Sequence, residues 1–291
     1  MKTVLVTGAN GQLGRSLQMA TKKAPSGFRF LFTDVDRLDI CDKDALMEYA
    51  KSQGVNYIVN CAAYTAVDKA EDDEITCMRI NSDAVRNLGE VATAIGAGII
   101  HISTDYVFDG TNSLPYLETD YTCPMSAYGR SKHRGELFLR AVCPEAIILR
   151  TAWLYSEYGN NFMRTMLRLG KEQKEVRVVF DQIGTPTYAP DLAGAILSIL
   201  AASETGNFKP GTYHYTDEGV CSWYDFARKI FELAGLECRA LPIDSKDYPT
   251  RAARPQYSVL NKGKIKKTYG LTIPHWEDSL KKAIANLLNT R

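Results

Sequence analysis

The sequence lacks the patterns that mark a disulfide-stabilised secreted protein or a zinc protein. Its seven cysteines are an odd number at wide spacings, and no Cys-x-x-Cys pair occurs. The four histidines are scattered, with no spacing typical of metal ligands. These absences favour reduced thiols in the cytoplasm over a disulfide framework, and they predict no metal site.

The chain also lacks a strong charge of either sign and a long apolar run. Its formal net charge is +1 over 291 residues, so no overall basic field points to nucleic acid or an anionic membrane. The longest nearly apolar run, Leu192 to Ala202, is too short to span a bilayer. The N-terminus, MKTVLVTGANG, is unlike a secretory signal. We therefore expect a cytoplasmic protein that binds neither nucleic acid nor membrane.

The first half of the chain alternates apolar, strand-like runs with amphipathic helical runs. The runs that read as buried strands are KTVLVTG, FRFLFTD, VNYIVNCA, AGIIHIST and EAIILRTAW. Strands this apolar, separated by helices, are typical of a parallel sheet covered on both faces. Right-handed crossovers then predict an α/β fold with a doubly wound, mainly parallel Rossmann sheet.

After about residue 150 the alternation weakens, which predicts a smaller, discontinuous C-terminal lobe. We assign residues 1–150 and about 176–220 to a dinucleotide-binding Rossmann domain. Residues of about 151–175 and 221–291 are assigned to a substrate-binding lobe.

A glycine-rich loop lies between the first predicted strand and the first predicted helix. Its spacing, Gly-x-x-Gly-x-x-Gly, is one residue longer than the common dehydrogenase form. Glycines permit a tight turn and close approach to a pyrophosphate, which then faces the N–H groups of the following helix. The residues predicted to contact a dinucleotide here are Gly8, Asn10, Gly11, Gln12, Leu13 and Gly14.

Further cofactor contacts are expected at the ends of the second and third predicted strands. Asp34, 20 residues after Gly14, can bond ribose hydroxyls and would disfavour a 2′-phosphate, which favours NAD(H). The alternative is an acidic turn residue. Asp39 and Ile40 follow, near enough to reach the adenine. The small side chains in Ala62-Ala63 allow close contact with a cofactor at a strand end.

Two motifs supply groups suited to proton transfer. Thr104 and Asp105 end the fourth predicted strand, where a hydroxyl can bond a carbonyl or alcohol oxygen, although such residues also merely terminate strands. Tyr128 and Lys132, four positions apart, share one helix face. An ammonium beside the phenol would lower the phenol pKa from its usual value near 10. With a bound nicotinamide, which the lysine can also hold, this set suits hydride transfer to a ketone.

These motifs resemble the dTDP-4-dehydrorhamnose reductase family of the extended short-chain dehydrogenase/reductase superfamily. The resemblance covers nearly the whole chain and rests on TGANGQLG, NCAAYTAVDKAE, INSDAVRNL, STDYVFDG, YGRSKHRGE, LRTAWLYS, GNNFMRTML, DQIGTPTYAPDLA and ARPQYSVLN. It implies reduction of the C4 ketone of dTDP-4-dehydro-L-rhamnose to dTDP-L-rhamnose, a precursor of surface polysaccharides. The coenzyme would be NADPH or NADH, and a homodimer is compatible with the resemblance.

The resemblance also implies roles for individual residues. The catalytic set would be Thr104, Tyr128 and Lys132. Dinucleotide contacts would include Gly8, Gly11, Gly14, Asp39, Ala62, Ala63, Thr65, Tyr128 and Lys132. The dTDP-sugar would contact Thr104, Asp105, Tyr106, Tyr128, Trp153 and Arg254. From the residues alone, Tyr106 and Trp153 could instead be packing aromatics, and Arg254 a surface ion-pair partner.

The chain departs from the family pattern in two places. Paired arginines often precede the proline, but here Ala253-Arg254-Pro255 leaves diphosphate contact to Arg254, with help from Arg251. Some members are described with magnesium held by glutamates at a dimer contact. The corresponding positions here are Arg15, Ser16 and Asp191, which weakens the case for that metal.

Two alternatives stay open from the sequence. A sugar-nucleotide dehydratase or epimerase shares the fold, but dehydratases place Asp-Glu after the threonine, where this chain has Asp105-Tyr106. A non-catalytic regulatory subunit, such as that of methionine adenosyltransferase, also resembles this family. The intact set of Thr104, Tyr128 and Lys132 argues against it.

Overall fold

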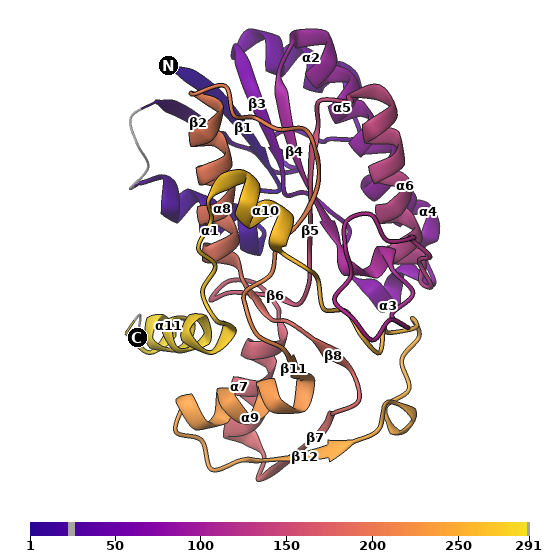
Figure 1. Cartoon of the computed structure of the whole chain (residues 1–291), viewed down its shortest axis with the longest axis vertical. Coiled ribbons are helices and arrows are strands. Elements are labelled where there is room, and N and C mark those ends of the chain that lie inside the picture. Colours follow the sequence, from indigo (N-terminus) through magenta and orange to yellow (C-terminus); the bar gives the residue numbers. More distant parts are fainter. Residues whose placement is uncertain (23–26, 290–291) are drawn as a thin grey trace.

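A parallel sheet forms the centre of the larger lobe. The structure is a computed structural model that describes residues 1–22 and 27–289, and within them the sheet has six strands in the order β10-β5-β4-β3-β1-β2. The strands are β1 (Lys2–Thr7), β2 (Phe28–Phe32), β3 (Val55–Asn60), β4 (Gly98–Thr104), β5 (Ile147–Thr151) and β10 (Gly211–His214), all paired in parallel (Figure 1). The predicted α/β fold with a doubly wound parallel sheet is confirmed.

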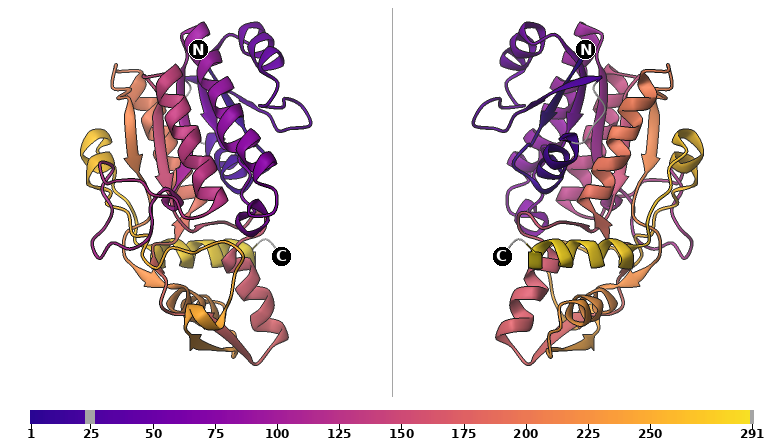
Figure 2. Two further views of the ribbon diagram at one scale, coloured as in Figure 1. Left: turned by 90° about the vertical axis from the view of Figure 1, so that its right-hand side faces the viewer. Right: turned by 90° about the vertical axis from the view of Figure 1, so that its left-hand side faces the viewer.

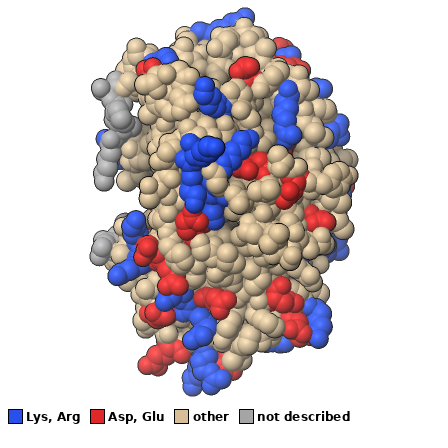
Figure 3. All heavy atoms as spheres, viewed as in Figure 1, with Lys and Arg blue, Asp and Glu red and all other residues tan. Residues whose placement is uncertain are grey.

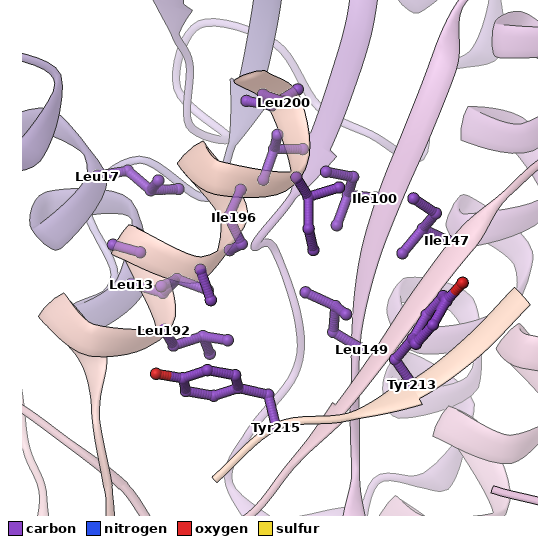
Figure 4. Close-up of a cluster of buried hydrophobic side chains, with 14 of the residues drawn as sticks. Leu13, Leu17, Ile100, Ile147, Leu149, Leu192, Ile196, Leu200, Tyr213 and Tyr215 are labelled. Carbon is purple, nitrogen blue, oxygen red and sulfur yellow. The ribbon is translucent and has the colours of Figure 1, made fainter. Parts of the chain in front are cut away.

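Helices cover both faces of this sheet (Figure 1). The helices of one face are α1 (Gln12–Thr21) and α8 (Ala189–Ser203); those of the other are α2 (Lys43–Ser52), α5 (Ala84–Ile95) and α6 (Ala127–Val142). Successive strand residues point to opposite faces. Val4 and Val6 accordingly pack with α1 and α8, whereas Leu5 packs with α2 and α5. Figure 4 shows the first of these cores, where Leu17 of α1 and Ile196 of α8 lie beside the strand residues.

Short elements at the carboxyl ends of β3 and β4 lead into the covering helices. After β3 come α3 (Val67–Ala70), α4 (Glu74–Met78) and a π-helical turn, η1 (Arg79–Asp83). After β4 comes a 3-10 turn, η2 (Asp105–Val107). In open α/β sheets, ligands bind outside these carboxyl ends.

A smaller lobe is built around a separate core. Its helices are α7 (Phe162–Glu172), α9 (Trp223–Leu233) and α11 (Trp276–Asn289). Its paired strands are β7 (Glu175–Val179) with β12 (Arg239–Ile243), and β8 (Ile183–Gly184) with β11 (Cys221–Ser222); β6 (Leu154–Tyr155) pairs with β9 (Thr187–Tyr188), and a 3-10 turn, η3, spans Ser245–Asp247. Figure 2 shows this lobe below the sheet, with α11 along its upper boundary.

Two segments lie across the lobe boundaries expected from the sequence. Strand β7, expected in the Rossmann segment 176–220, pairs with β12 of the smaller lobe. Helix α10 (Gly263–Tyr269), expected in the substrate lobe, contacts β10 and α8, and its Ile265 is buried in the Rossmann core. The reason is that a local pattern predicts a strand or a helix but does not identify its partner.

The surface carries both signs of charge. Figure 3 shows acidic and basic side chains on one face, with lysines grouped around α10, where Lys266 pairs with Glu218. Of the helices described, none combines the length and the apolar character that crossing a bilayer requires.

Candidate active site

The glycine loop follows β1 and opens α1. Gly8 has φ +65°, and a Cβ at this position would lie 2.5 Å from the backbone N of Ala62. Only glycine therefore lets this loop approach the chain after β3 so closely. Gly11 is the N-cap of α1 and brings no capping side chain, so the first N–H groups of the helix stay available to an anion.

A pocket of about 310 Å³ opens beside this loop. It brings together these predicted cofactor residues: Gly8, Gly11, Asp34, Asp39, Ile40, Ala62 and Ala63. It is also lined by residues that the sequence did not single out, namely Val35, Leu38, Cys61 and Ile80. A glycine cradle with an acidic edge and apolar walls suits the adenosine half of a dinucleotide.

Gln12 and Leu13 are two other predicted contacts of the loop. Their side chains are already engaged, so only their backbone atoms can contact a dinucleotide. The side chain of Gln12 bonds Leu154 O, Ser156 and Asn161, so it ties the loop to the smaller lobe. Leu13 is buried in the Rossmann core.

The remaining predicted cofactor residues lie around the same loop. Asn10 N donates to Asp34 Oδ2 over 2.7 Å, and Val35 N donates to Asp34 Oδ1 over 2.8 Å, so that carboxylate is fixed at the edge of the loop. Gly14 is buried in the first turn of α1, and Thr65 is exposed on the segment after β3.

Thr104 and Tyr128 meet because the start of α6 packs on the chain that follows β4. A Cβ at Gly129 would lie 2.3 Å from Tyr106 O, so only glycine permits this approach. Ser126 caps α6 by accepting from Gly129 N. The hydroxyls of Tyr128 and Thr104 face each other at the carboxyl end of β4.

The acid–base properties of Tyr128 differ from the expectation. Burial raises the pKa of its phenol, and the neighbouring Thr104 hydroxyl opposes this only in part. The predicted lowering by Lys132 is wrong for the protein alone, because Lys132 Nζ donates instead to Ile102 O over 2.6 Å. The raised pKa keeps the phenol protonated at neutral pH, in the form that donates a proton.

Lys132 is 2% exposed and lies on the same helix. Burial lowers the pKa of its amine to about 8, while the nearby Glu136 carboxylate acts in the opposite direction. Its Nζ lies 3.4 Å from Nε2 of the buried His101, whose Nδ1 lies 2.9 Å from Asn60 Nδ2. Sequence analysis missed Asn60 and His101, although polar residues within apolar strand runs are a signal for such a network.

The predicted sugar-binding residues extend from Thr104 toward the smaller lobe. Thr104 Oγ1 donates to Asp105 Oδ1 over 2.9 Å, and burial raises the pKa of Asp105 to about 6. The ring of Tyr106 lies edge-on to that of Tyr128, with centroids 5.5 Å apart. Arg254 Nη1 donates to Tyr106 Oη over 3.3 Å. The structure therefore brings Asp105, Tyr106 and Arg254 together beside Thr104 and Tyr128.

Trp153 lies on the chain before β6. It has φ +48°, a conformation that non-glycine residues rarely adopt and that clusters at functional sites. Its ring stacks on Trp223 with centroids 3.5 Å apart. A Cβ at Gly184 would meet both the Trp153 ring and Ser258 Oγ, and the Ser258 hydroxyl faces Asp105.

The positions considered for magnesium make other contacts. Asp191 accepts a hydrogen bond from Ser279 Oγ over 2.5 Å, and Arg15 lies over the ring of Tyr158. Among residues 1–22 and 27–289, no three His, Cys, Asp or Glu side chains are grouped closely enough to hold a metal ion.

Comparison with known proteins identifies the family. The profile of the family described as RmlD substrate binding domain matches residues 1–289. A dTDP-4-dehydrorhamnose reductase of Aggregatibacter actinomycetemcomitans is 43% identical over 289 residues, covering 97% of this chain and 98% of that protein. The crystal structure of a dTDP-4-dehydrorhamnose reductase from Clostridium acetobutylicum ATCC 824 matches with a TM-score of 0.92 at 42% identity, covering 98% and 99% of the two chains. That of the enzyme from Bacillus anthracis str. Ames, in complex with NADP, matches with a TM-score of 0.91 at 38% identity, covering 98% and 100%. The chain therefore belongs to the dTDP-4-dehydrorhamnose reductase family of nicotinamide-dependent oxidoreductases.

Proposed function

We propose that this protein reduces the C4 ketone of dTDP-4-dehydro-L-rhamnose to dTDP-L-rhamnose, with NADPH or NADH as coenzyme. The observation that carries the proposal is the contact of the Thr104 and Tyr128 hydroxyls at the carboxyl end of β4, on the same sheet edge as the glycine-loop pocket. Relatives named for this activity cover nearly the whole chain.

The glycine-loop pocket would hold the adenosine and pyrophosphate of the coenzyme. Gly8 and Gly11 would face the pyrophosphate, Asp34 the adenosine ribose, and Asp39 with Ile40 the adenine. Ala62, Ala63 and Thr65 would border the path to Lys132, which would hold the nicotinamide ribose. The relative from Bacillus anthracis was solved with NADP, which supports use of NADPH.

Thr104 and Tyr128 would bind the ketone oxygen. When bound, the reduced nicotinamide supplies a hydride to the ketone carbon. Two hydroxyls aimed at one oxygen stabilise the negative charge that develops there, and Tyr128 donates its proton to that oxygen. Because burial raises the pKa of Tyr128, the phenol is protonated before the reaction.

The smaller lobe would hold the rest of the sugar nucleotide. Asp105 and Tyr106 would border the sugar next to Thr104, Trp153 would cover it from the other side, and Arg254 would bind the diphosphate. A guanidinium suits a diphosphate because it donates in a fixed, planar fork. We further propose a cytoplasmic location, and a homodimer as the assembly to test by light scattering.

The direct test supplies dTDP-4-dehydro-L-rhamnose with NADH and NADPH in parallel. Loss of absorbance at the nicotinamide band should match the dTDP-L-rhamnose formed, mole for mole. Product formed without coenzyme consumption would instead indicate an epimerase or dehydratase that recycles bound coenzyme. No oxidation of either coenzyme would favour a non-catalytic binding protein.

A further inference from the structure

A row of buried polar side chains crosses the sheet from the coenzyme pocket to Lys132. Thr7 and Asn60 end β1 and β3, His101 lies in the middle of β4, and the three are register partners on these adjacent strands. Each is at most 1% exposed. A buried polar row of this kind must have each donor matched to an acceptor, so its hydrogen-bond directions can be worked out.

The backbone N–H of Ala62 can only donate a hydrogen bond. It therefore fixes the orientation of the Asn60 amide and the direction of the hydrogen bonds along the row. The backbone N–H of Ala62 lies 3.1 Å from Asn60 Oδ1, and Thr7 Oγ1 donates to the same oxygen over 2.7 Å. The amide oxygen of Asn60 must therefore face these donors, because the reversed amide would place its NH₂ against the N–H of Ala62. The NH₂ group of Asn60 then faces His101 Nδ1 at 2.9 Å.

The tautomer of His101 follows from this orientation. Its Nδ1 accepts from Asn60, so the ring proton is on Nε2. Burial lowers the pKa of His101 well below its usual value, so the ring does not carry a second proton near neutral pH. The Nε2–H group faces Lys132 Nζ at 3.4 Å.

We propose that His101 is a positioning residue for Lys132: its Nε2–H group donates to the lysine nitrogen and favours the neutral amine over the ammonium. An amine has a lone pair to accept this hydrogen bond and two N–H groups, one of which donates to Ile102 O over 2.6 Å. An ammonium has no lone pair, and one of its N–H groups would point at another donor. The second N–H of the amine stays available to a ligand.

The other groups that face Lys132 would favour its ammonium form if they were charged and unpaired. Each of them is either neutral or already bonded to a cation. Cys61 and Cys77 face it from the chain after β3 and from α4, and any negative charge on their thiols would favour the ammonium. Burial raises the pKa of both thiols, so both are neutral near pH 7. Glu136 on α6 also favours the ammonium, but Arg150 bonds both of its oxygens.

Burial lowers the pKa of Lys132 to about 8, and a hydrogen bond from His101 would act in the same direction. A group in this range can both take and release a proton, whereas an ordinary lysine, with a pKa near 10.4, is fixed as a cation. The value of this property for catalysis rests on the proposed function, but the coupling of His101 to Lys132 does not. The coupling is therefore tested on the cofactor-free protein, without turnover.

The test is a titration of Lys132 by NMR in the full-length protein labelled with [6-¹³C]lysine. The Lys132 signal is identified by its loss in Lys132→Met. Its midpoint should lie near 8 in the unmodified protein. His101→Asn retains an oxygen that can accept from Asn60 but removes the Nε2–H group, so the midpoint should rise by on the order of one pH unit.

A second variant reverses the direction of the hydrogen bonds along the row, and a third serves as the control. Asn60→Asp offers His101 only an acceptor, which moves the ring proton to Nδ1 and turns the Nε2 lone pair toward Lys132, so the midpoint should rise again. His133→Asn changes a histidine next to Lys132 that bonds Thr122 instead, and it should leave the midpoint unchanged.

Two results would overturn the proposal. One is an unchanged Lys132 midpoint in a folded His101→Asn protein. The other needs no variant: ¹⁵N NMR of the unmodified protein that places the His101 proton on Nδ1. Failure of the proposed reductase function would appear in the turnover assay with the keto sugar and would leave these titrations unaffected.

Discussion

The two sides of the site are held by contacts of different kinds. On the sheet side, Lys132, His101 and Asn60 are buried and joined by a continuous row of hydrogen bonds. On the side of the smaller lobe, Arg254 pairs with Asp68 over 2.5 Å, with side chains 20% and 45% exposed. Lys132 is therefore set in place before any ligand binds, whereas Arg254 is held by a partner that a ligand can replace.

The two kinds of contact also differ in the free energy needed to break them. Hydrogen bonds and ion pairs in a buried setting are costly to break because the remaining partner is left without solvent. Exposed ion pairs contribute at most about 1 kcal/mol, so exchanging one for a diphosphate costs little.

Tyr128→Phe should have the largest effect, because it removes the proposed proton donor and keeps the ring. We expect kcat to fall by about 10³-fold. NADPH affinity should be preserved in a fluorescence titration, because the phenol contributes little to holding the dinucleotide. Tyr121→Phe, at a tyrosine that is 88% exposed, is the matched control and should behave as the unmodified protein. Turnover retained by Tyr128→Phe would remove the phenol from the mechanism.

Glu136→Gln tests the buried contacts behind the catalytic helix. Glu136 is fully buried and accepts from Arg150 Nε and Nη2 over 2.9 and 2.7 Å, which joins α6 to β5. Loss of its charge should lower the free energy of unfolding by about 3 kcal/mol in chemical denaturation, because the Arg150 charge stays buried.

The control is Glu74→Gln, which removes the partly exposed pair with Arg130 and should cost no more than about 1 kcal/mol. The pH dependence has a definite sign. Although burial alone would raise it, the pKa of Glu136 is lowered by Arg150, so the contribution is present at neutral pH and is lost as the pH falls below the usual carboxyl range. Equal losses in the two variants would contradict the distinction between buried and exposed pairs.

The Arg254–Asp68 pair gives variants with opposite effects. Arg254→Met should raise KM for the dTDP-sugar by about tenfold or more while kcat changes little, since the proposed charge-assisted bond to the diphosphate would be lost. Asp68→Asn should lower KM by about threefold, because the group that competes with the diphosphate is weakened. A rise in KM in both variants would mean that the pair stays closed and acts as a structural contact.

The sequence predicted the features that depend on local periodicity. Apolar runs predicted the sheet, the glycine loop predicted residues that line one pocket, and the motif order led to the family, a prediction that the relatives confirm. The partners of Arg254, Trp153 and Lys132 were not predicted. Asp68, Trp223 and His101 are far from them in the chain, and only the packing of the lobes and the strand register bring them together.

The prediction of a lowered pKa for Tyr128 was wrong for a related reason. Helical spacing puts Tyr128 and Lys132 on one face, but it does not reveal that the amine donates to Ile102 O or that the phenol is desolvated. Burial is a property of the assembled fold, and at this site it outweighs the effect expected from a neighbouring charge.

Asp34→Asn should have the smallest effect, and it tests the coenzyme side of the sheet. The carboxylate is fixed at the pocket edge by Asn10 N and Val35 N, and in the proposed function it would repel a 2′-phosphate. The amide keeps an oxygen that can accept a hydrogen bond but removes the charge. The ratio of kcat/KM for NADPH to that for NADH should therefore rise by about fivefold to tenfold, as expected for a partly solvated pair of charges.

Asp36→Asn, on the same turn but exposed and outside the pocket lining, is the control for this effect. It removes the same charge from the same segment, so a general change in potential would move the ratio equally in both variants. The ratio of kcat/KM for NADPH to that for NADH should change only in Asp34→Asn, and high salt should reduce that change only in part. This result would show that charge repulsion at the pocket edge sets the coenzyme preference. An equal shift in both variants would mean that the fixed carboxylate of Asp34 serves the shape of the glycine loop and does not select the coenzyme.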